Sequence, residues 1–257
     1  MGELVDWIDK VKRYYRFSSS ELRAIIITVI ALGFVISFRD WGSNEVNLGS
    51  GFFNFFMAII IVLFSFLIHD FAIKGASLTI GLRSEYKMWT FGIILAVILA
   101  FATNGRFWFL IPGGVIMHHL AGHRLGFFRY GLNYFGLGFS CLAGPIASIF
   151  LALIFRSLNS FAQSPILHKA MVFNVTFAIF TVLPIPPADG SRLLYGSRMV
   201  YVLGLAFVAV SSLLVLINVP LIFVLLGSFL AAVACWLLYY IFYENKAWGG
   251  PYQLPPT

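Results

Sequence analysis

Long apolar runs are the feature that most constrains the fold of this chain. A helix needs about 20 apolar residues to span the hydrocarbon core of a bilayer. Six runs of about this length cover roughly residues 22–38, 51–72, 131–155, 166–187, 199–218 and 220–242. A weaker pair lies at roughly 88–103 and 107–118. We therefore expect an all-α polytopic membrane protein with about six to eight transmembrane helices.

The composition agrees with a membrane protein and excludes several other classes. Hydrophobic residues make up 60% of the chain and charged residues only 11%, against about 25% charged residues in a soluble domain. The formal charge is +7, but the cations are scattered between apolar runs. We therefore expect the lipid bilayer as a partner, and no nucleic acid. Both cysteines lie in apolar runs and define no disulfide framework.

The two ends of the chain differ from its middle. Apolar residues at helical spacing, among them Trp7, Ile8 and Val11, predict an amphipathic segment over residues 1–20 that lies on the membrane surface. Residues 21–243 are expected to form a single transmembrane domain. The polar tail 244–257, with its glycines and prolines, is expected to be flexible.

The distribution of cations predicts the topology. Of the 17 Lys and Arg residues, four fall on one side of the predicted membrane and the other 13 on the opposite side. The four are Arg39, Arg106, Arg156 and Lys169. Because cytoplasmic connections carry the excess of Lys and Arg, we expect an integral protein of the cytoplasmic membrane with both termini in the cytoplasm.

The segment 107–118 has features that a continuous helix would not tolerate well. It contains Pro112, Gly113 and Gly114, which favour a broken or re-entrant element. Such backbone is tolerated at membrane depth only where protein shields it from lipid. The sequence leaves open whether this segment crosses the membrane.

Polar residues inside apolar runs are costly and are candidates for function. Of the ten acidic residues, Asp70 and Asp189 fall within or directly against such runs. His69 precedes Asp70, and the topology places His69 and Asp189 on the same side at similar depth. A structural alternative is a His-Asp pair bonded to nearby carbonyls, with the prolines before Asp189 acting as a helix stop.

Three stretches in this order resemble the site-2 protease family of intramembrane zinc metalloproteases. They are His69–Ile73, Ser140–Pro145 and Leu183–Gly190, and the resemblance covers a core of roughly residues 50–200. It implies a zinc ion held by two histidines one helical turn apart and by a distant aspartate, with water at the fourth position. A glutamate beside the first histidine would act as general base.

The resemblance carries over to only part of this chain. His69 and Asp189 match two zinc ligands, and Asp70 stands at the position of the general base. Ile73 stands where the second histidine belongs, and isoleucine cannot bind a metal. Zinc is thus an uncertain cofactor.

Four further positions belong to the family's substrate-binding elements. Ser148 and Thr181 stand at the two asparagine positions expected to hold substrate backbone, and Pro184 and Pro186 are retained beside them. The resemblance implies that these four residues contact a substrate or partner.

Two main hypotheses follow. The first is a catalytically impaired relative that binds transmembrane segments or subunits of a membrane complex. The second is an active protease in which His118, His119 or His123 replaces the missing ligand and Asp70 is the base. These histidines could instead face lipid headgroups, or His119 and His123 could be a decayed catalytic motif. A transporter that shares only local motifs is a third possibility.

Overall fold

The computed structural model describes residues 2–41, 47–120, 134–217 and 219–244. The described part is mainly helical, with one two-stranded sheet. The elements are α1 (Gly2–Tyr14), α2 (Ser19–Ser37), η1 (Phe38–Trp41), α3 (Leu48–Thr79), β1 (Leu82–Met88), α4 (Thr90–Ala102), β2 (Gly113–His119), α6 (Tyr134–Ala162), α7 (Pro165–Val182), α8 (Asp189–Gly196), α9 (Arg198–Leu216), α10 (Leu221–Tyr239) and η3 (Tyr240–Glu244).

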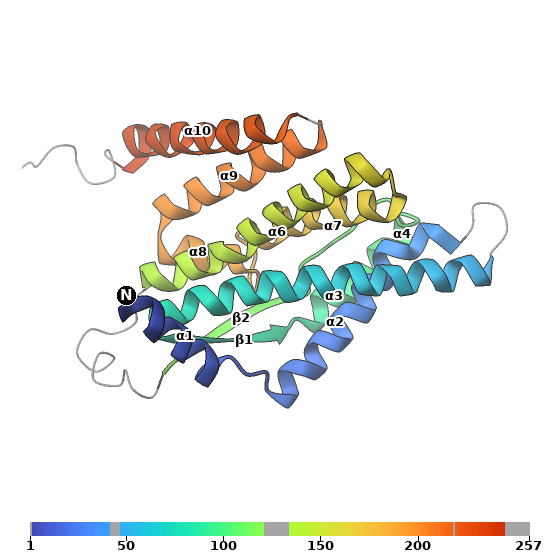
Figure 1. Ribbon diagram of the computed structural model, residues 1–257, viewed down its shortest axis with the longest axis horizontal. Coiled ribbons are helices and arrows are strands. Elements are labelled where there is room, and N and C mark those ends of the chain that lie inside the picture. Colours follow the sequence, from blue (N-terminus) through green and yellow to red (C-terminus); the bar gives the residue numbers. More distant parts are fainter. Residues whose placement is uncertain (1, 42–46, 121–133, 218, 245–257) are drawn as a thin grey trace, which may run out of the picture.

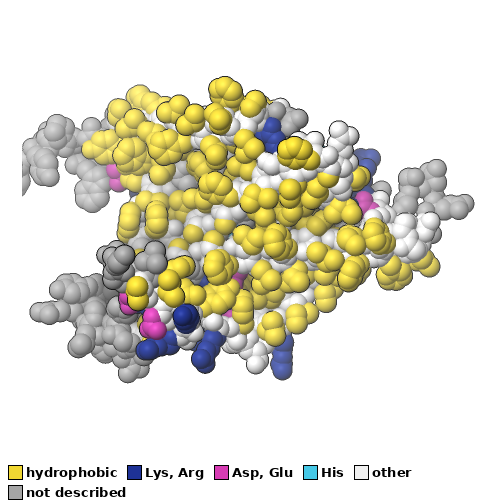
Figure 2. All heavy atoms as spheres, in the orientation of Figure 1, with side chains coloured by type: hydrophobic (Ala, Val, Ile, Leu, Met, Phe, Trp, Pro, Cys, Tyr) yellow, Lys and Arg dark blue, Asp and Glu magenta, His cyan; other side chains and the backbone are white. Residues whose placement is uncertain are grey.

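Six of the described helices are long and apolar enough to cross a membrane: α2, α3, α6, α7, α9 and α10. Many of their large apolar side chains are exposed, and hydrophobic side chains cover most of the face seen in Figure 2. Exposing so many apolar side chains to water would cost much free energy, whereas contact with lipid tails carries no such cost. The chain is an all-α polytopic membrane protein, as the apolar runs predict.

Helix α3 runs through the middle of the molecule (Figure 1). It packs against α6 on one side, and α6 packs in turn against α7 and α9, with α10 lying against α9. On the other side α3 packs against α2 and β1. This arrangement lets residues of α3 meet residues of α6, α8 and the sheet.

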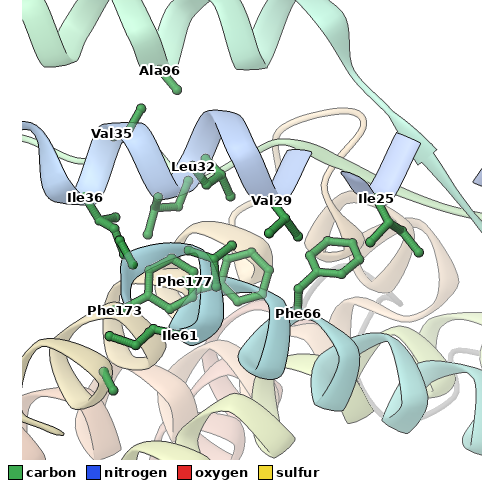
Figure 3. Packing of buried hydrophobic residues seen from close by; sticks show 14 of the residues in the cluster. Ile25, Val29, Leu32, Val35, Ile36, Ile61, Phe66, Ala96, Phe173 and Phe177 are labelled. Atoms are coloured by element: carbon green, nitrogen blue, oxygen red, sulfur yellow. The ribbon is translucent and has the colours of Figure 1, made fainter. Parts of the chain in front are cut away.

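Two apolar cores hold the helices together. In the first, α2 fits between α3, α4 and α7: Figure 3 shows Val35 facing Ala96 of α4, while Leu32 lies over Phe173 and Phe177 of α7. The second core joins α6, α7, α9 and α10. Burial of large side chains such as Phe173 contributes roughly 1.5–3 kcal/mol each in water. In lipid, close packing replaces that hydrophobic contribution.

The segment 107–118 is not a continuous helix, and part of it is a strand, a structure that the sequence did not predict. Residues Gly113–His119 form strand β2, which pairs antiparallel with β1 in the register Met88–Gly113 to Leu82–His119. A Cβ atom on Gly113 would lie 2.3 Å from the carbonyl oxygen of Lys87, so only glycine allows this close pairing. Residues 110–115 are all buried, so protein shields the start of this extended backbone from lipid.

The other weak segment, 88–103, forms the short helix α4. Its 13 residues extend about 20 Å, less than the roughly 30 Å of the hydrocarbon core. The turn after α4 nevertheless lies close to the end of α2, because a Cβ atom on Gly105 would lie 2.7 Å from Cγ of Arg39. The α2–α3, α6–α7 and α9–α10 connections lie at this same end of the bundle (Figure 1).

The N-terminal helix α1 is docked rather than free. The indole nitrogen of Trp7 donates a hydrogen bond to the carbonyl oxygen of Gly75, near the end of α3, at 3.0 Å. The predicted tail 244–257 lies outside the described residues apart from Glu244.

Candidate functional site

His69 and Asp189, 120 residues apart in sequence, lie in direct contact. The Nε2 atom of His69 is 3.2 Å from Oδ2 of Asp189, and its Nδ1 atom is 3.0 Å from the hydroxyl of Ser148. The backbone N–H of Val115 donates to the other carboxylate oxygen of Asp189 at 3.3 Å. Four elements, α3, α6, α8 and β2, therefore meet at one buried polar cluster.

Glycines create the space in which these elements meet. A Cβ atom on Gly144 of α6 would lie 2.5 Å from Nε2 of His69. On Gly114 of β2 it would lie 1.9 Å from the carbonyl oxygen of Pro187. On Gly190 it would lie 2.0 Å from the carbonyl oxygen of Val182. These three glycines thus bring the backbone of α6, β2 and the Pro-rich loop close to His69 and Asp189.

A small cavity adjoins the His69–Asp189 pair. Its volume is about 10 Å³, which is about the minimum for one water molecule. Asp70, Ile73 and Thr181 contribute to its walls along with His69 and Asp189. The structure thus brings these five residues, which come from α3, α7 and α8, to one small cavity.

Ile73 stands at the position where the resemblance leads one to expect a second histidine ligand. It lies one helical turn after His69, is fully buried, and packs with Val115 and Cys141 in a small apolar cluster. Within the described ranges, no group of three or more His, Cys, Asp and Glu side chains is placed to hold a metal ion.

His118, one of the alternative histidine ligands, is not part of this cluster. His118 is exposed on β2 and lines a different cavity beside Glu85. His119 ends β2, about 13 Å along the strand from Val115. His123 lies outside the described residues.

Asp70 is not a free carboxylate. Its Oδ2 atom lies 2.9 Å from the ammonium nitrogen of Lys74, which also lies 2.6 Å from Oε1 of Glu21. The backbone N–H of Tyr86 donates to the same Glu21 oxygen at 2.8 Å. All three charged residues are at most 3% exposed, so the position expected for a general base belongs to a buried ion-pair cluster.

Sequence reasoning missed Glu21 as a buried acid. It counted only two acids at membrane depth, yet Glu21 in the first turn of α2 is 1% exposed. The available signals were its position at the start of an apolar run and a lysine, Lys74, four residues after Asp70. Neither signal identifies the partner, because α2 and α3 meet only in the folded chain.

The four residues expected to contact substrate behave differently from one another. Ser148 contacts His69, and the hydroxyl of Thr181 donates to the carbonyl oxygens of Phe177 and Ala178 in its own helix. Pro184 and Pro186 are exposed in the loop between α7 and α8.

The sequence of this chain is similar to that of a protein with an assigned name. The chain is 28% identical over 185 residues to a Methanocaldococcus jannaschii protein named "Putative zinc metalloprotease MJ0611". The similarity covers 70% of this chain and 86% of that protein. No known protein family and no solved structure gave a match. The chain is thus a metalloprotease-like membrane protein.

Proposed function

We propose that this chain is a catalytically impaired relative of the site-2 proteases that binds transmembrane segments of other proteins. The observation that carries the proposal is Ile73, which is fully buried and packed among apolar atoms where the second histidine ligand would stand. An apolar side chain at this position removes one of the three protein ligands that a catalytic zinc site uses.

The remaining residues fit zinc only in part. Bonds of about 2.0–2.2 Å in a tetrahedral site place neighbouring ligand atoms roughly 3.3–3.6 Å apart, close to the 3.2 Å between His69 Nε2 and Asp189 Oδ2. The third ligand is absent, and its loss weakens zinc binding by several kcal/mol. We therefore derive no hydrolytic step from this site.

A groove on α6 supports the binding role. Its volume is about 330 Å³, and its wall is apolar, with Ala143 and Ala147 one turn apart between Phe139 and Phe150. Small residues at this spacing let a second helix approach closely in the membrane. The groove lies on a membrane-spanning helix, so a transmembrane helix is the partner that fits it.

Metal content tests the loss of catalysis. We expect purified wild-type protein to contain no more zinc than the Asp189→Ala variant. About one zinc ion per chain, lost in that variant, would overturn this part of the proposal.

Groove filling tests the binding role. Crosslinking in native membranes, read by mass spectrometry, would report transmembrane proteins attached at α6. The double variant Ala143→Leu/Ala147→Leu should lose these crosslinks. Ala234→Leu, an exposed position on α10, should keep them as the matched control. Equal crosslinking in both variants would contradict the proposal.

A second candidate is an active protease with a rebuilt site. It is favoured by the name of the relative and by the cavity that Asp70 shares with His69 and Asp189. If it holds, the purified chain cleaves transmembrane peptides in liposomes, and His69→Ala abolishes that cleavage. If it does not, the two preparations are indistinguishable.

The proposal also includes the orientation of the chain in the cytoplasmic membrane. The four cations counted on the outer side lie in or beside the connections at one end of the bundle. We assign that end to the outer face of the cytoplasmic membrane, and both termini to the cytoplasm. Accessibility of single cysteines to a membrane-impermeant reagent measures this orientation.

A further inference from the structure

A second cavity lies far from His69, at the opposite end of α6. It opens between the α6–α7 and α9–α10 connections and has a volume of about 600 Å³. These connections lie at the same end of the bundle in Figure 1. Its polar wall includes Arg156, Ser157 and Ser160 of α6, and its apolar wall includes Leu216 and Leu221 at the facing ends of α9 and α10.

Arg156 brings an unbalanced positive charge to this cavity. Its guanidinium donates hydrogen bonds to the carbonyl oxygens of Leu214, at 3.5 Å, and of Val219. Both acceptors are neutral, and Arg156 takes part in none of the ion pairs formed among the described residues. A guanidinium has five N–H donors, so donors remain for a ligand.

The surroundings add further polar groups. The imidazole of His168, in the first turn of α7, completes this part of the wall. Among the described residues that line the cavity, none is Asp or Glu. The polar wall therefore favours a ligand with negative charge.

The depth of the cavity indicates where this ligand comes from. Its walls are formed by the ends of four membrane-spanning helices, α6, α7, α9 and α10. Helix ends of this kind meet the phosphate layer of the bilayer. An arginine fork matches the oxygens of a phosphate group, and the leucines opposite can contact the first methylene groups of an acyl chain.

We infer that this cavity binds the phosphate of an anionic phospholipid, with Arg156 as the main contact. The headgroup lies between Arg156 and His168, and the acyl chain follows the apolar wall beside Leu216 and Leu221. The bound lipid thereby joins the α6–α7 hairpin to the α9–α10 hairpin. This site is independent of the proposed loss of zinc.

Lipid retention measured by native mass spectrometry tests the assignment. Full-length protein would be reconstituted with equal amounts of phosphatidylglycerol and phosphatidylcholine, then released from detergent. We expect wild-type protein to retain phosphatidylglycerol preferentially. Arg156→Gln should reduce this retention about tenfold or more, since the lost hydrogen bond is charge-assisted. Arg106→Gln, an exposed cation at the same end of the bundle, should retain it as wild type does.

A second variant guards against misfolding of Arg156→Gln. Ser160→Trp would fill the cavity and leave the bonds from Arg156 to the α9–α10 connection intact. We expect it to lose phosphatidylglycerol while its melting temperature in lipid-free detergent stays unchanged. Wild-type protein that retains both lipids equally, or a Ser160→Trp variant that retains phosphatidylglycerol normally, would overturn the inference. Displacement of the lipid by millimolar inorganic phosphate would assign the cavity to a soluble anion and would also overturn it.

Discussion

The ammonium nitrogen of Lys74 lies 2.9 Å from the carboxylate of Asp70, one helical turn away on α3. The same nitrogen contacts Glu21 of α2 at 2.6 Å. The acid beside His69 is therefore part of a buried ion-pair cluster that joins two membrane helices. Among the described residues, this carboxylate is paired with Lys74, whereas His69 is paired with Asp189.

Removing the cation should destabilise the protein strongly. Lys74→Met would leave Asp70 and Glu21 buried without a counter-ion, and breaking a buried pair in this way costs about 3–5 kcal/mol. We expect a clearly lower melting temperature in detergent, measured by intrinsic fluorescence.

The matched control for this prediction is Lys10→Met. Lys10 pairs with Asp6 on α1 at 2.7 Å, and the Asp6 side chain is 61% exposed. Since exposed pairs contribute little to stability, its melting temperature should stay close to wild type. Equal melting temperatures for the Lys74 and Lys10 variants would contradict the importance of the buried cluster.

Restoring the absent ligand should create a metal site. Residue 73 lies on the same face of α3 as His69, one turn later, which is the spacing of a two-histidine zinc site. We expect Ile73→His to purify with zinc that wild-type protein lacks, as measured by elemental analysis. Ile73→Asn, which adds polarity without a comparable ligand, should remain free of zinc. If Ile73→His also contains no zinc, His69 and Asp189 are not positioned to act as two ligands of a metal site.

Gly144 should be intolerant of even one added carbon. Its Cβ atom would lie 2.5 Å from Nε2 of His69 and 2.8 Å from Cδ1 of Ile73. Gly144→Ala should therefore push α6 away from α3 and destabilise the protein by about 1–3 kcal/mol, measured by thermal unfolding in detergent. Gly49→Ala is the control, because its Cβ atom would meet only Oδ1 of Asn47, at 3.5 Å. A Gly144→Ala variant as stable as Gly49→Ala would contradict the close contact.

Tyr15 should make the protein sensitive to alkaline pH. Burial, followed by the negative charges of Asp70 and Glu21, raises the pKa of Tyr15 from 10.0 to about 12. Since the folded pKa lies above the unfolded one, this contribution to stability is complete below pH 10 and is lost as the pH rises through about 12. Tyr15→Phe should flatten the fall in melting temperature over that range. If the melting temperature of Tyr15→Phe falls with pH as steeply as that of wild type, ionisation of Tyr15 is not linked to unfolding.

Much of the site could be predicted because its signals are local. The motif around His69 and the Pro-rich loop before Asp189 each close an apolar run, and the alternation of apolar runs and cationic connections places both on the same side of the membrane. The structure brings them within 3.2 Å. The local sequence pattern could not predict that Glu21 is buried, because its burial depends on the ion pair with Lys74 of α3.

The sequence by itself determined that the chain is a membrane protein with about six to eight candidate spanning segments, because length and hydropathy report directly on the exchange of water for lipid. It also determined that Ile73 cannot act as a ligand. The tertiary structure decided that Gly113–His119 is a strand, since an extended backbone at this depth is stable only when β1 supplies its hydrogen bonds. It likewise decided that Asp70, Lys74 and Glu21 share one buried cluster, because charges can be neutralised in an apolar interior only by partners that folding brings together.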